Sequence, residues 1–533
     1  MFNNLPTDIA VFSTMRENDY IYVDKTKQIY ELIQPGKKYF LSRPRRFGKS
    51  LLLDTLKELF EGNKKLFKGL YIEDKWDWSK TYPVLHLDMS GQDVKSPKIF
   101  KNSLNDLINK IAKDNSISLI TKEMKLKFSE LIEELSKKYG KKIVVLIDEY
   151  DFPIIDNMDN IKIAEENKTI LSEFYQVLKK SERYIHFLFL TGVSKFSKTT
   201  IFSKLNNLTD LTIDPRYATI CGYTQKELNS YFNEYILKLA DKKGDNYDKT
   251  LERIKNCYDG YSWDGENFLY NPNSILKTLD QKRYSNFWFE SGTPTFLLDL
   301  IKRDNIDISN FLSLNASFDG EFPTFQLDNL DLKTILLQTG YLTIKKHISE
   351  KYDKYILDIP NNEVKKSLFS YLIGMYTSNM PGEIGPLAID FLNALIQKDN
   401  DKTSQILDIL LGKIPYQVQM KNWKYYHSIF PTWFYMMGLE TIAEESNSQG
   451  QIDAVLKYKT LHIIVEIKYS ETKSIKTMLN EANKQIYQKR YYQTYQDKNP
   501  IILAIAIQDT ENAKEIKCQI HTLKELKEKY NNN

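Results

Sequence analysis

The chain has 533 residues, of which 42% are hydrophobic and 27% are charged, which is the composition of a globular protein. At roughly 100–200 residues per domain, this length predicts about three or four domains. The 74 Lys and Arg residues nearly balance the 70 Asp and Glu residues, so the net charge of +4 does not by itself indicate a nucleic-acid-binding class.

The residue pattern argues against a membrane-spanning protein and against a secreted one. No apolar run approaches the ~18 residues that span a bilayer, and the first residues lack a basic segment followed by an apolar one. The three cysteines, Cys221, Cys257 and Cys518, lie far apart without metal-ligand spacing. We therefore expect a cytoplasmic protein without a membrane partner. The histidines also lack metal spacing and are expected in core or surface roles: His86, His186, His347, His427, His462 and His521.

The segment Lys38–Leu53 passes from an apolar strand through a tight loop to an amphipathic helix. The loop ends in Gly48, Lys49 and Ser50. Glycine lets backbone N–H groups approach phosphate oxygens, lysine reaches the β- and γ-phosphates, and the hydroxyl binds Mg²⁺ at the positive helix end. The segment predicts a nucleotide-binding loop.

The loop departs from the pattern G-x-x-x-x-G-K-[ST] at one position. Arg43 occupies the place of the first glycine, and Arg45 and Arg46 follow it. We expect Arg43 and Arg46 to contribute to cofactor binding. The alternative is a basic turn that only precedes a helix.

The second signal is the apolar run Ile143–Ile147, which predicts a buried parallel strand and ends in Asp148 and Glu149. At such a strand end, aspartate binds Mg²⁺, usually through water, and glutamate polarises the attacking water. The alternative is a strand that exits into solvent. The glycine, lysine and serine of the loop, about a hundred residues upstream, favour the nucleotide site.

A third apolar strand, Ile185–Leu190, is followed by Thr191. Its hydroxyl is a candidate contact for the γ-phosphate or the attacking water, or it only caps the end of the strand. Strands alternate with helices over residues 37–220, which predicts a parallel α/β sheet with its site at the carboxyl ends of the strands.

Several short blocks carry a family resemblance. YVDKT, RPRRFGKS, IDEYD, TGVSKFS, LNNLTDLT, CGYTQKEL, YDGYSW and YNPNSIL occur in this order within residues 1–300. Together they resemble the bacterial AAA-ATPase-like family, whose loop also tends to begin with Arg-Pro. The resemblance implies a P-loop ATPase core of the additional-strand, catalytic-glutamate type that uses ATP and Mg²⁺. It places Lys49, Ser50, Asp148 and Glu149 in the roles given above.

Residues 223–300 predict a helical or winged-helix lid, with a plain connecting module as the alternative. Arg216 is a weak candidate for a phosphate contact, within the chain or towards a neighbour, because most such arginines are structural or solvated. Residues 301–415 have a helical pattern without a catalytic constellation and are expected to join two active domains.

The last part of the chain holds a second constellation. Glu466 and Lys468 lie two positions apart on an apolar strand and therefore share a face. A hairpin brings Asp453 back towards Glu466. Two carboxylates suit Mg²⁺, and the lysine can orient or help deprotonate a water. The alternative is an exposed salt bridge on a hairpin.

The pattern D-x12-E-x-K, with GQIDAVL and VEIKYS, is similar to the PD-(D/E)xK nuclease superfamily. The resemblance implies that Gln485 on the next helix supports the site. It also implies that a basic-aromatic face meets nucleic acid; its members are Lys489, Arg490, Tyr491 and Tyr492. Lys424 stands where some superfamily members carry an extra acidic ligand, so that ligand cannot be placed.

The sequence thus predicts an α/β protein in four parts. They are a P-loop NTPase domain with a parallel sheet (1–222), a helical or winged-helix lid (223–300), a helical linker region (301–415) and a restriction-endonuclease-like α/β domain (416–533). The favoured hypothesis is a P-loop ATPase that controls a Mg²⁺-dependent nuclease acting on nucleic acid, DNA rather than RNA. The alternatives are a nucleotide-driven switch that binds without cutting, and a loop that binds nucleotide without hydrolysis. The sequence leaves open whether the protein forms a homo-oligomer.

Overall fold

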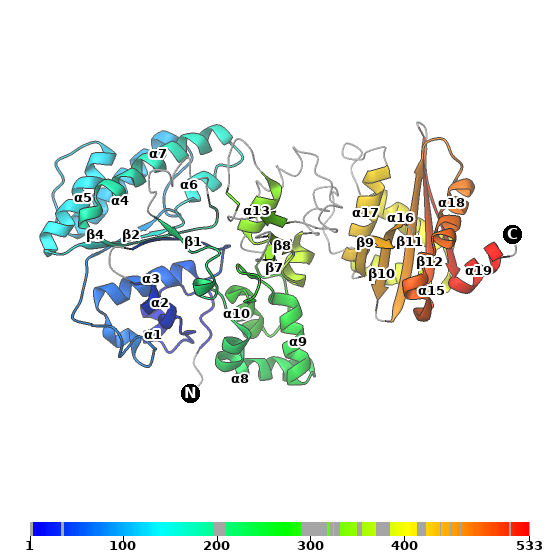
Figure 1. Cartoon of the computed structure of the whole chain (residues 1–533), viewed down its shortest axis with the longest axis horizontal. Helices are drawn as coiled ribbons and strands as arrows, with labels where there is room; N and C mark the ends of the chain where they lie inside the picture. The colour runs from blue at the N-terminus through cyan, green and yellow to red at the C-terminus, as the bar shows by residue number, and fades with distance from the viewer. Residues whose placement is uncertain are drawn as a thin grey trace. The chain divides into compact units, whose positions relative to one another are not determined.

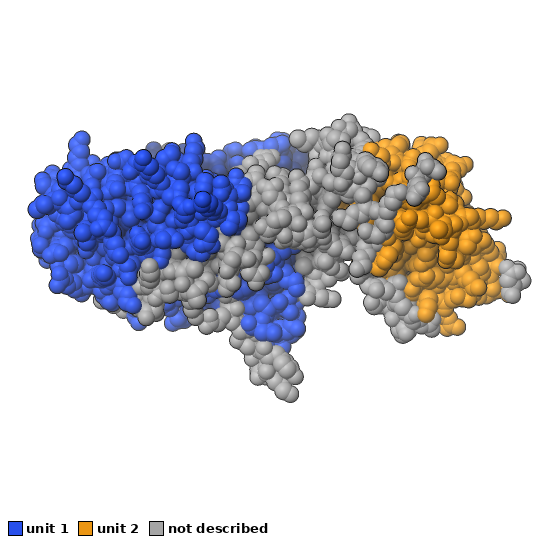
Figure 2. Space-filling view, turned by 90° about the horizontal axis from the view of Figure 1, so that it is seen from above, with its two compact units in different colours: residues 1–300, 315–365 blue, residues 301–314, 366–533 orange. Residues whose placement is uncertain are grey.

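The structure is a computed structural model that describes residues 4–33, 37–195, 208–288, 317–319, 323–324, 331–348, 354–368, 384–412, 423–437, 439–447, 450–458, 460–510 and 513–531. The chain divides into two compact units (Figure 2). Unit 1 comprises residues 1–300 and 315–365, and unit 2 comprises residues 301–314 and 366–533.

A five-stranded parallel sheet forms the centre of unit 1. Its strands, in spatial order, are β2 (Val84–Asp88), β3 (Ile143–Asp148), β4 (Ile185–Gly192), β1 (Lys38–Ser42) and β5 (Thr209–Asp210). Strand β4 lies between β1, which leads into the phosphate loop, and β3, which ends in Asp148. This is the additional strand that the resemblance implies, and it confirms the predicted parallel sheet. The carboxyl ends of β1, β3 and β4 meet at one edge.

Helices cover both faces of this sheet (Figure 1). One face carries α1 (Phe12–Glu17), α2 (Thr26–Leu32) and α3 (Lys49–Glu61); the other carries α4 (Pro97–Asp114), α5 (Met124–Tyr139) and α7 (Ile161–Lys180). Because both faces are covered, every residue of β3 is buried, which explains its unbroken apolar run. Short helical turns connect these elements: η1 (Lys64–Phe67), α6 (Phe152–Ile155), η2 (Glu182–Tyr184) and η4 (Pro215–Tyr217).

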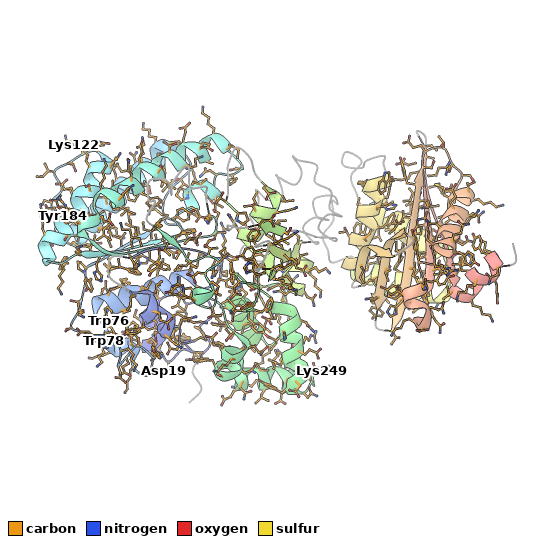
Figure 3. The ribbon with its side chains drawn as sticks, viewed as in Figure 1. Asp19, Trp76, Trp78, Lys122, Tyr184 and Lys249 are labelled. Atoms are coloured by element: carbon orange, nitrogen blue, oxygen red, sulfur yellow. The ribbon has the colours of Figure 1, made fainter. Side chains whose placement is uncertain are left out.

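Two tryptophans extend the core on the α3 face (Figure 3). The ring of Trp76 meets Phe60 of α3 edge-on at 6.0 Å between centroids. Trp78 packs against Phe67 of η1 at 5.1 Å. These contacts anchor the segment between α3 and β2 against the helices that follow the phosphate loop.

Three helices form the region predicted as a lid: α8 (Gln225–Lys243), α9 (Tyr247–Tyr258) and α10 (Pro272–Gln281). Thr224 and Glu227 form a capping box that fixes the start of α8. The apolar faces of the three helices share a core with Ile21 and Val23 of the entry segment. The lid and the amino-terminal residues are therefore packed together.

The expected helical region at residues 301–415 also contains strands, which the sequence did not predict. It contains α13 (Leu332–Thr339) and an antiparallel sheet of β6 (Ser317–Asp319), β8 (Lys354–Asp358) and β7 (Thr343–Ile348). Tyr355 and Leu357 of β8 are buried while their neighbours are less so, which is the alternation of a half-buried strand. The sequence does not reveal these short strands because helical spacing dominates the surrounding residues.

Unit 2 contains a mixed sheet in the spatial order β13 (Lys514–Thr522), β12 (Ile501–Asp509), β11 (Leu461–Ser470), β10 (Gly450–Tyr458) and β9 (Glu440–Asn447). The β11–β12 pair is parallel and the others are antiparallel. One face packs on α15 (Ile384–Gln397), α16 (Asn400–Gly412) and α17 (Trp423–Met436). The other packs on α18 (Ile475–Gln488), η8 (Gln493–Lys498) and α19 (Leu523–Asn531). This sheet confirms the predicted carboxy-terminal α/β fold.

Helix α16 protects the edge of this sheet. The backbone N–H of Cys518 in β13 donates to Ser404 Oγ at 2.9 Å, and that of Ile520 donates to Asn400 Oδ1 at 2.9 Å. Open strand edges invite pairing with other chains, and these side chains satisfy two of the edge donors. Helices α15 and α16, expected in the linker region, thus pack within unit 2, while the four domain boundaries stay predictions.

Candidate functional site

A cavity of about 490 Å³ lies beside the loop that joins β1 to α3. The predicted site residues that line it are Arg46, Gly48, Lys49, Ser50 and Glu149. Gly48 has a φ of 94°, a left-handed conformation that favours glycine, and a Cβ there would meet nothing within 4 Å. The loop therefore turns into α3 with its backbone uncovered at Gly48.

Lys49 is buried at the start of α3. Its Nζ donates to the carbonyl oxygens of Arg43 and Pro44, each at 3.0 Å. These bonds hold the ammonium group over the loop, next to the N–H groups at the helix N-terminus. A positive charge and helix donors together make an anion-binding site.

Asp148, Glu149 and Thr191 meet where β3 and β4 end. Thr191 Oγ1 donates to Asp148 Oδ1 at 2.6 Å, and the Glu149 N–H donates to the same oxygen at 3.0 Å. Glu149 has a φ of 47°, uncommon for a residue with a side chain and often found at functional sites. Burial raises the pKa of its carboxyl, and the charge of Lys49 opposes this rise. The two side chains are thus electrostatically coupled at one cavity.

Arg43 does not line this cavity, so its predicted contact with a cofactor is not supported. Its side chain is 0% exposed, donates to the carbonyls of Thr212 (2.8 Å) and Tyr217 (3.4 Å), and lies 4.1 Å over the ring of Trp263. Burial lowers the pKa of its guanidinium to about 10. Arg43 instead ties the loop to segments more than a hundred residues later.

Arg46 and Arg216, the other two arginines considered as phosphate contacts, are exposed. Arg46 lies at the cavity, with Nη1 3.8 Å from Asp8 Oδ1. Arg216 is exposed and pairs with Asp214 at 2.5 Å. The solvated alternative therefore describes Arg216 better than a phosphate contact does.

Asp151 locks the ends of β3 and β4 together. It is buried, and its Oδ2 accepts from the N–H groups of Val193 (3.1 Å) and Ser194 (2.6 Å). Burial raises the pKa of its carboxyl, while the hydrogen bonds from Ser194 lower it. The strand end that carries Thr191 is therefore fixed relative to Asp148 and Glu149.

Replacing Gly192 by alanine is expected to loosen this arrangement. A Cβ at Gly192 would lie 2.6 Å from Asp151 Oδ1 and 2.6 Å from two ring atoms of Tyr150. Such overpacking costs about 1–3 kcal/mol, which denaturant unfolding would measure. Gly91→Ala is the control, because its Cβ would meet its nearest atom at 3.9 Å. If the two variants have the same free energy of unfolding, Gly192 does not pack closely against Asp151 and Tyr150.

In unit 2, the predicted acidic and basic residues meet on one face of the sheet. Lys468 Nζ donates to Glu466 Oε1 and to Gln485 Oε1, each at 2.7 Å. Gln485 Nε2 in turn donates to Tyr491 Oη at 3.2 Å. The strand β11 and the helix α18 thus supply a connected lysine–glutamate–glutamine group.

Asp453 joins this group where the hairpin strands diverge. Pairing between β10 and β11 begins only at Ala454, and Asp453 Oδ2 accepts from the N–H of Ile467 at 2.6 Å. Burial, and next the charge of Asp453, raise the pKa of Glu466 to about 8. The two carboxylates are therefore close enough to act on each other.

This arrangement fits a divalent cation. Glu466 is 0% exposed, and its Oε2 has no hydrogen-bond partner among the described residues. Carboxylate oxygens are the ligands that Mg²⁺ prefers. Within the described ranges, no three Asp, Glu, His or Cys side chains are grouped as metal ligands, so the protein would supply Asp453 and Glu466 and leave other positions to water or substrate.

Comparison with known proteins finds matches to both ends of the chain. A family model described as "Predicted AAA-ATPase" matches residues 6–202, and one described as "PD-(D/E)XK nuclease superfamily" matches residues 421–518. The "Uncharacterized protein in vnfD 5'region" of Azotobacter chroococcum mcd 1 is 34% identical over 520 residues, 96% of this chain and 97% of that protein. The chain belongs to the AAA-ATPase-like family with a carboxy-terminal PD-(D/E)XK domain. The resemblance read from the sequence is confirmed.

One expectation for the PD-(D/E)XK domain needs correction. The predicted basic-aromatic face does not lie on the helix, because α18 ends at Gln488. Arg490 then adopts a φ of 48° and turns the chain, so that Tyr491 and Tyr492 enter the core while Lys489 and Arg490 stay exposed. The exposed members of the predicted face are therefore the two cations, while both tyrosines are buried.

His427 is a site residue of this domain that the sequence did not reveal. It lies on α17 one turn after Lys424, with Nδ1 3.4 Å from Asp453 Oδ1 and Nε2 3.2 Å from the carbonyl oxygen of Ile467. It bridges the first carboxylate to the strand that carries the other two groups. No spacing in the sequence links it to Asp453, because the contact forms only when α17 packs on the sheet.

The raised pKa of Glu466 predicts pH-dependent metal affinity. Below about pH 8 a cation must displace the Glu466 proton, so Mn²⁺ affinity is expected to rise with pH, about tenfold per unit, and to level off above that pKa. Titration calorimetry over this pH range measures it. Glu466→Gln should bind weakly without this slope. An unchanged affinity across the range would contradict the site.

The same shift has a defined effect on stability. The pKa of Glu466 in the folded protein lies above its value of 4.5 in the unfolded chain. Protonation of Glu466 therefore stabilises the metal-free fold, and this contribution is fully present below pH 4.5. This contribution is lost as pH rises through the folded value of about 8. Bound metal should restore stability above that pH.

None of the described helices is long and apolar enough to cross a membrane.

Proposed function

We propose that the AAA-ATPase-like domain binds and hydrolyses ATP with Mg²⁺, and that this reaction controls a metal-dependent nuclease formed by unit 2. Nucleic acid is the proposed substrate, DNA in preference to RNA, in the cytoplasm. The observation that carries the proposal is the buried Glu466 carboxyl group, which is hydrogen-bonded to Lys468 through one oxygen and has no hydrogen-bond partner among the described residues at the other. The interior of an apolar strand has no structural need for such a group.

In the ATPase site, the residues have separable roles. Lys49 would neutralise the β- and γ-phosphates, and the N–H groups at the start of α3 would bind the same oxygens. Ser50 and Asp148 would hold the Mg²⁺ ion, which when bound stabilises charge on the phosphates. Glu149 would orient and polarise the attacking water, and its raised pKa suits proton acceptance. Thr191 would keep Asp148 in place through its hydrogen bond.

In the nuclease site, Asp453 and Glu466 would hold a divalent cation, which when bound lowers the pKa of water and stabilises charge on the scissile phosphate. Lys468 would orient the nucleophilic water and neutralise developing charge. Gln485 would position Lys468, because it accepts one of its hydrogen bonds. His427 would position Asp453.

Contacts within unit 1 support control by the nucleotide. Trp288 Nε1 donates to the carbonyl of Arg45 in the phosphate loop at 3.3 Å, and a Cβ on Gly340 would lie 2.7 Å from the ring of Pro44. The N–H of Lys195, just beyond β4, donates to Gln338 Oε1 at 3.0 Å. A change in the loop would therefore reach α13 and the residues that precede unit 2 in the chain.

The test is a cleavage assay with the purified full chain. Supercoiled plasmid, linear duplex DNA and RNA are incubated with Mg²⁺ or Mn²⁺, with ATP, with a non-hydrolysable analogue, or without nucleotide. Cleavage that requires metal and responds to ATP supports the proposal. Normal ATP turnover with no cleavage under any metal would favour the alternative of a nucleotide-driven binding switch, which the absence of a third grouped carboxylate among the described residues also fits.

A further inference from the structure

The cavity beside the phosphate loop has two chemically different ends. Its loop end carries charge, from Arg45, Arg46 and Lys49. Its other wall comes from the entry segment and the lid, and these residues are mainly apolar. They include Pro6, Ile9, Ala10, Ile21, Val23, Ile220, Tyr223 and Leu276. An apolar wall suits the flat surface of a base, whereas phosphates need the charged end.

The charged side chains that this wall also carries have partners: Asp8 Oδ1 lies 3.8 Å from Arg46 Nη1, and Lys25 Nζ lies 2.7 Å from Glu227 Oε1. Asn273 differs from them. Asn273 lies in the first turn of α10, lines the cavity, and is 9% exposed. Its Nδ2 has no hydrogen-bond partner among the described residues. A buried donor without an acceptor is unfavourable, and in native proteins it usually meets a ligand or a water.

The neighbouring asparagine shows that helix capping does not explain Asn273. Asn271 is the N-cap of α10, and its side chain accepts from the Ser274 N–H at 3.2 Å. The Nδ2 of Asn271 also lacks a partner, but Asn271 does not line the cavity. Asn273 is therefore the residue of this pair that a ligand in the cavity can reach.

The position of α10 places Asn273 at the base end. Leu276, one turn along the same helix, lines the cavity and shares a core with Ile21 and Val23 of the entry segment. Pro272, on the other side, has no N–H and cannot bind a phosphate oxygen. No cation adjoins Asn273 in the first turn of α10.

We infer that Asn273 is a specificity-determining residue that reads the edge of the nucleotide base, with Nδ2 donating to a ring nitrogen of adenine. This rests on the proposed nucleotide binding of the same cavity. An amide carries a donor and an acceptor in one plane, which matches the adjacent ring nitrogen and amino group of adenine. Through Asn273 the lid contacts the base directly. Base recognition is then the function of the sequence block YNPNSIL, which contains Asn273.

Titration calorimetry of the full chain with three probes tests the inference: ATP, GTP and inorganic tripolyphosphate. Asn273→Ala is expected to weaken ATP about tenfold, the loss of one hydrogen bond, and to leave tripolyphosphate unchanged. Asn273→Asp carries only acceptors, which suit the two donors on the guanine edge. It should shift the ratio of ATP to GTP affinity towards GTP by about tenfold or more.

The control is Asn229→Asp, which makes the same charge change on the exposed face of α8, outside the cavity. It should change neither affinity nor thermal stability. Equal weakening of ATP and tripolyphosphate by Asn273→Ala, or no weakening, would overturn the inference. If the unaltered chain binds neither ATP nor GTP, the proposed function itself fails, so the two failures are distinguishable.

Discussion

Replacing Lys49 by alanine is expected to weaken ATP binding on the order of 10–100-fold and to abolish ATP hydrolysis, because a charge-assisted hydrogen bond to phosphate is lost. The ammonium group is buried over the loop, where it donates to the carbonyls of Arg43 and Pro44 and forms no ion pair with the part of the chain that the structure describes. Calorimetric ATP titration and phosphate release measure the two effects. Any nuclease activity that depends on ATP should fall in parallel.

A matched control lies on the same helix. Lys57 is partly exposed and pairs with Glu58 and Glu61, so Lys57→Ala should leave ATP affinity unchanged. Glu149→Gln separates binding from chemistry: it should retain ATP affinity and lose turnover, since the amide cannot polarise water. Unchanged ATP affinity in the Lys49 variant, with its fold intact by circular dichroism, would exclude the loop as the nucleotide site.

The parts of the fold that the sequence reveals are those encoded locally. The apolar run Ile143–Ile147 and the helical spacing after Gly48 each need only neighbouring residues, and both elements are found. The group of Glu466 and Lys468 follows from the two-residue period of a strand. Local patterns therefore predicted the strands that carry both candidate sites and most of the residues that the structure brings together there.

What could not be predicted depends on contacts between distant segments. Arg43 looks like a phosphate ligand because it stands beside Arg45 and Arg46, yet Thr212, Tyr217 and Trp263 bury it. His427 reaches Asp453 only through the packing of α17. No local pattern carries such information, since the partners are separated by tens to hundreds of positions.

Replacing Lys468 by alanine is expected to reduce metal-dependent cleavage on the order of 10²–10³-fold, the loss typical when one group that stabilises transition-state charge is removed. Asp453→Ala and Glu466→Gln should reduce cleavage at least as much, because each removes a proposed metal ligand. Initial rates on plasmid DNA at saturating Mn²⁺ measure these effects, with ATP turnover recorded in the same reactions. Turnover should persist, since these residues lie in unit 2 and the ATPase residues in unit 1.

The control for Lys468 is Lys473→Ala. Lys473 is an exposed lysine just before α18 that pairs with Glu481 at 2.8 Å, and its loss should leave cleavage unchanged. Leaving Glu466 without its partner also has a structural cost, because a buried carboxylate loses its compensating charge. Lys468→Ala must therefore be compared with Lys468→Ala/Glu466→Gln, which restores a neutral core. If the double variant recovers stability, the stability lost in Lys468→Ala comes from the broken pair with Glu466. If Lys468→Ala itself keeps its cleavage rate with its fold intact, Lys468 has no role in the chemistry and the pair is only structural.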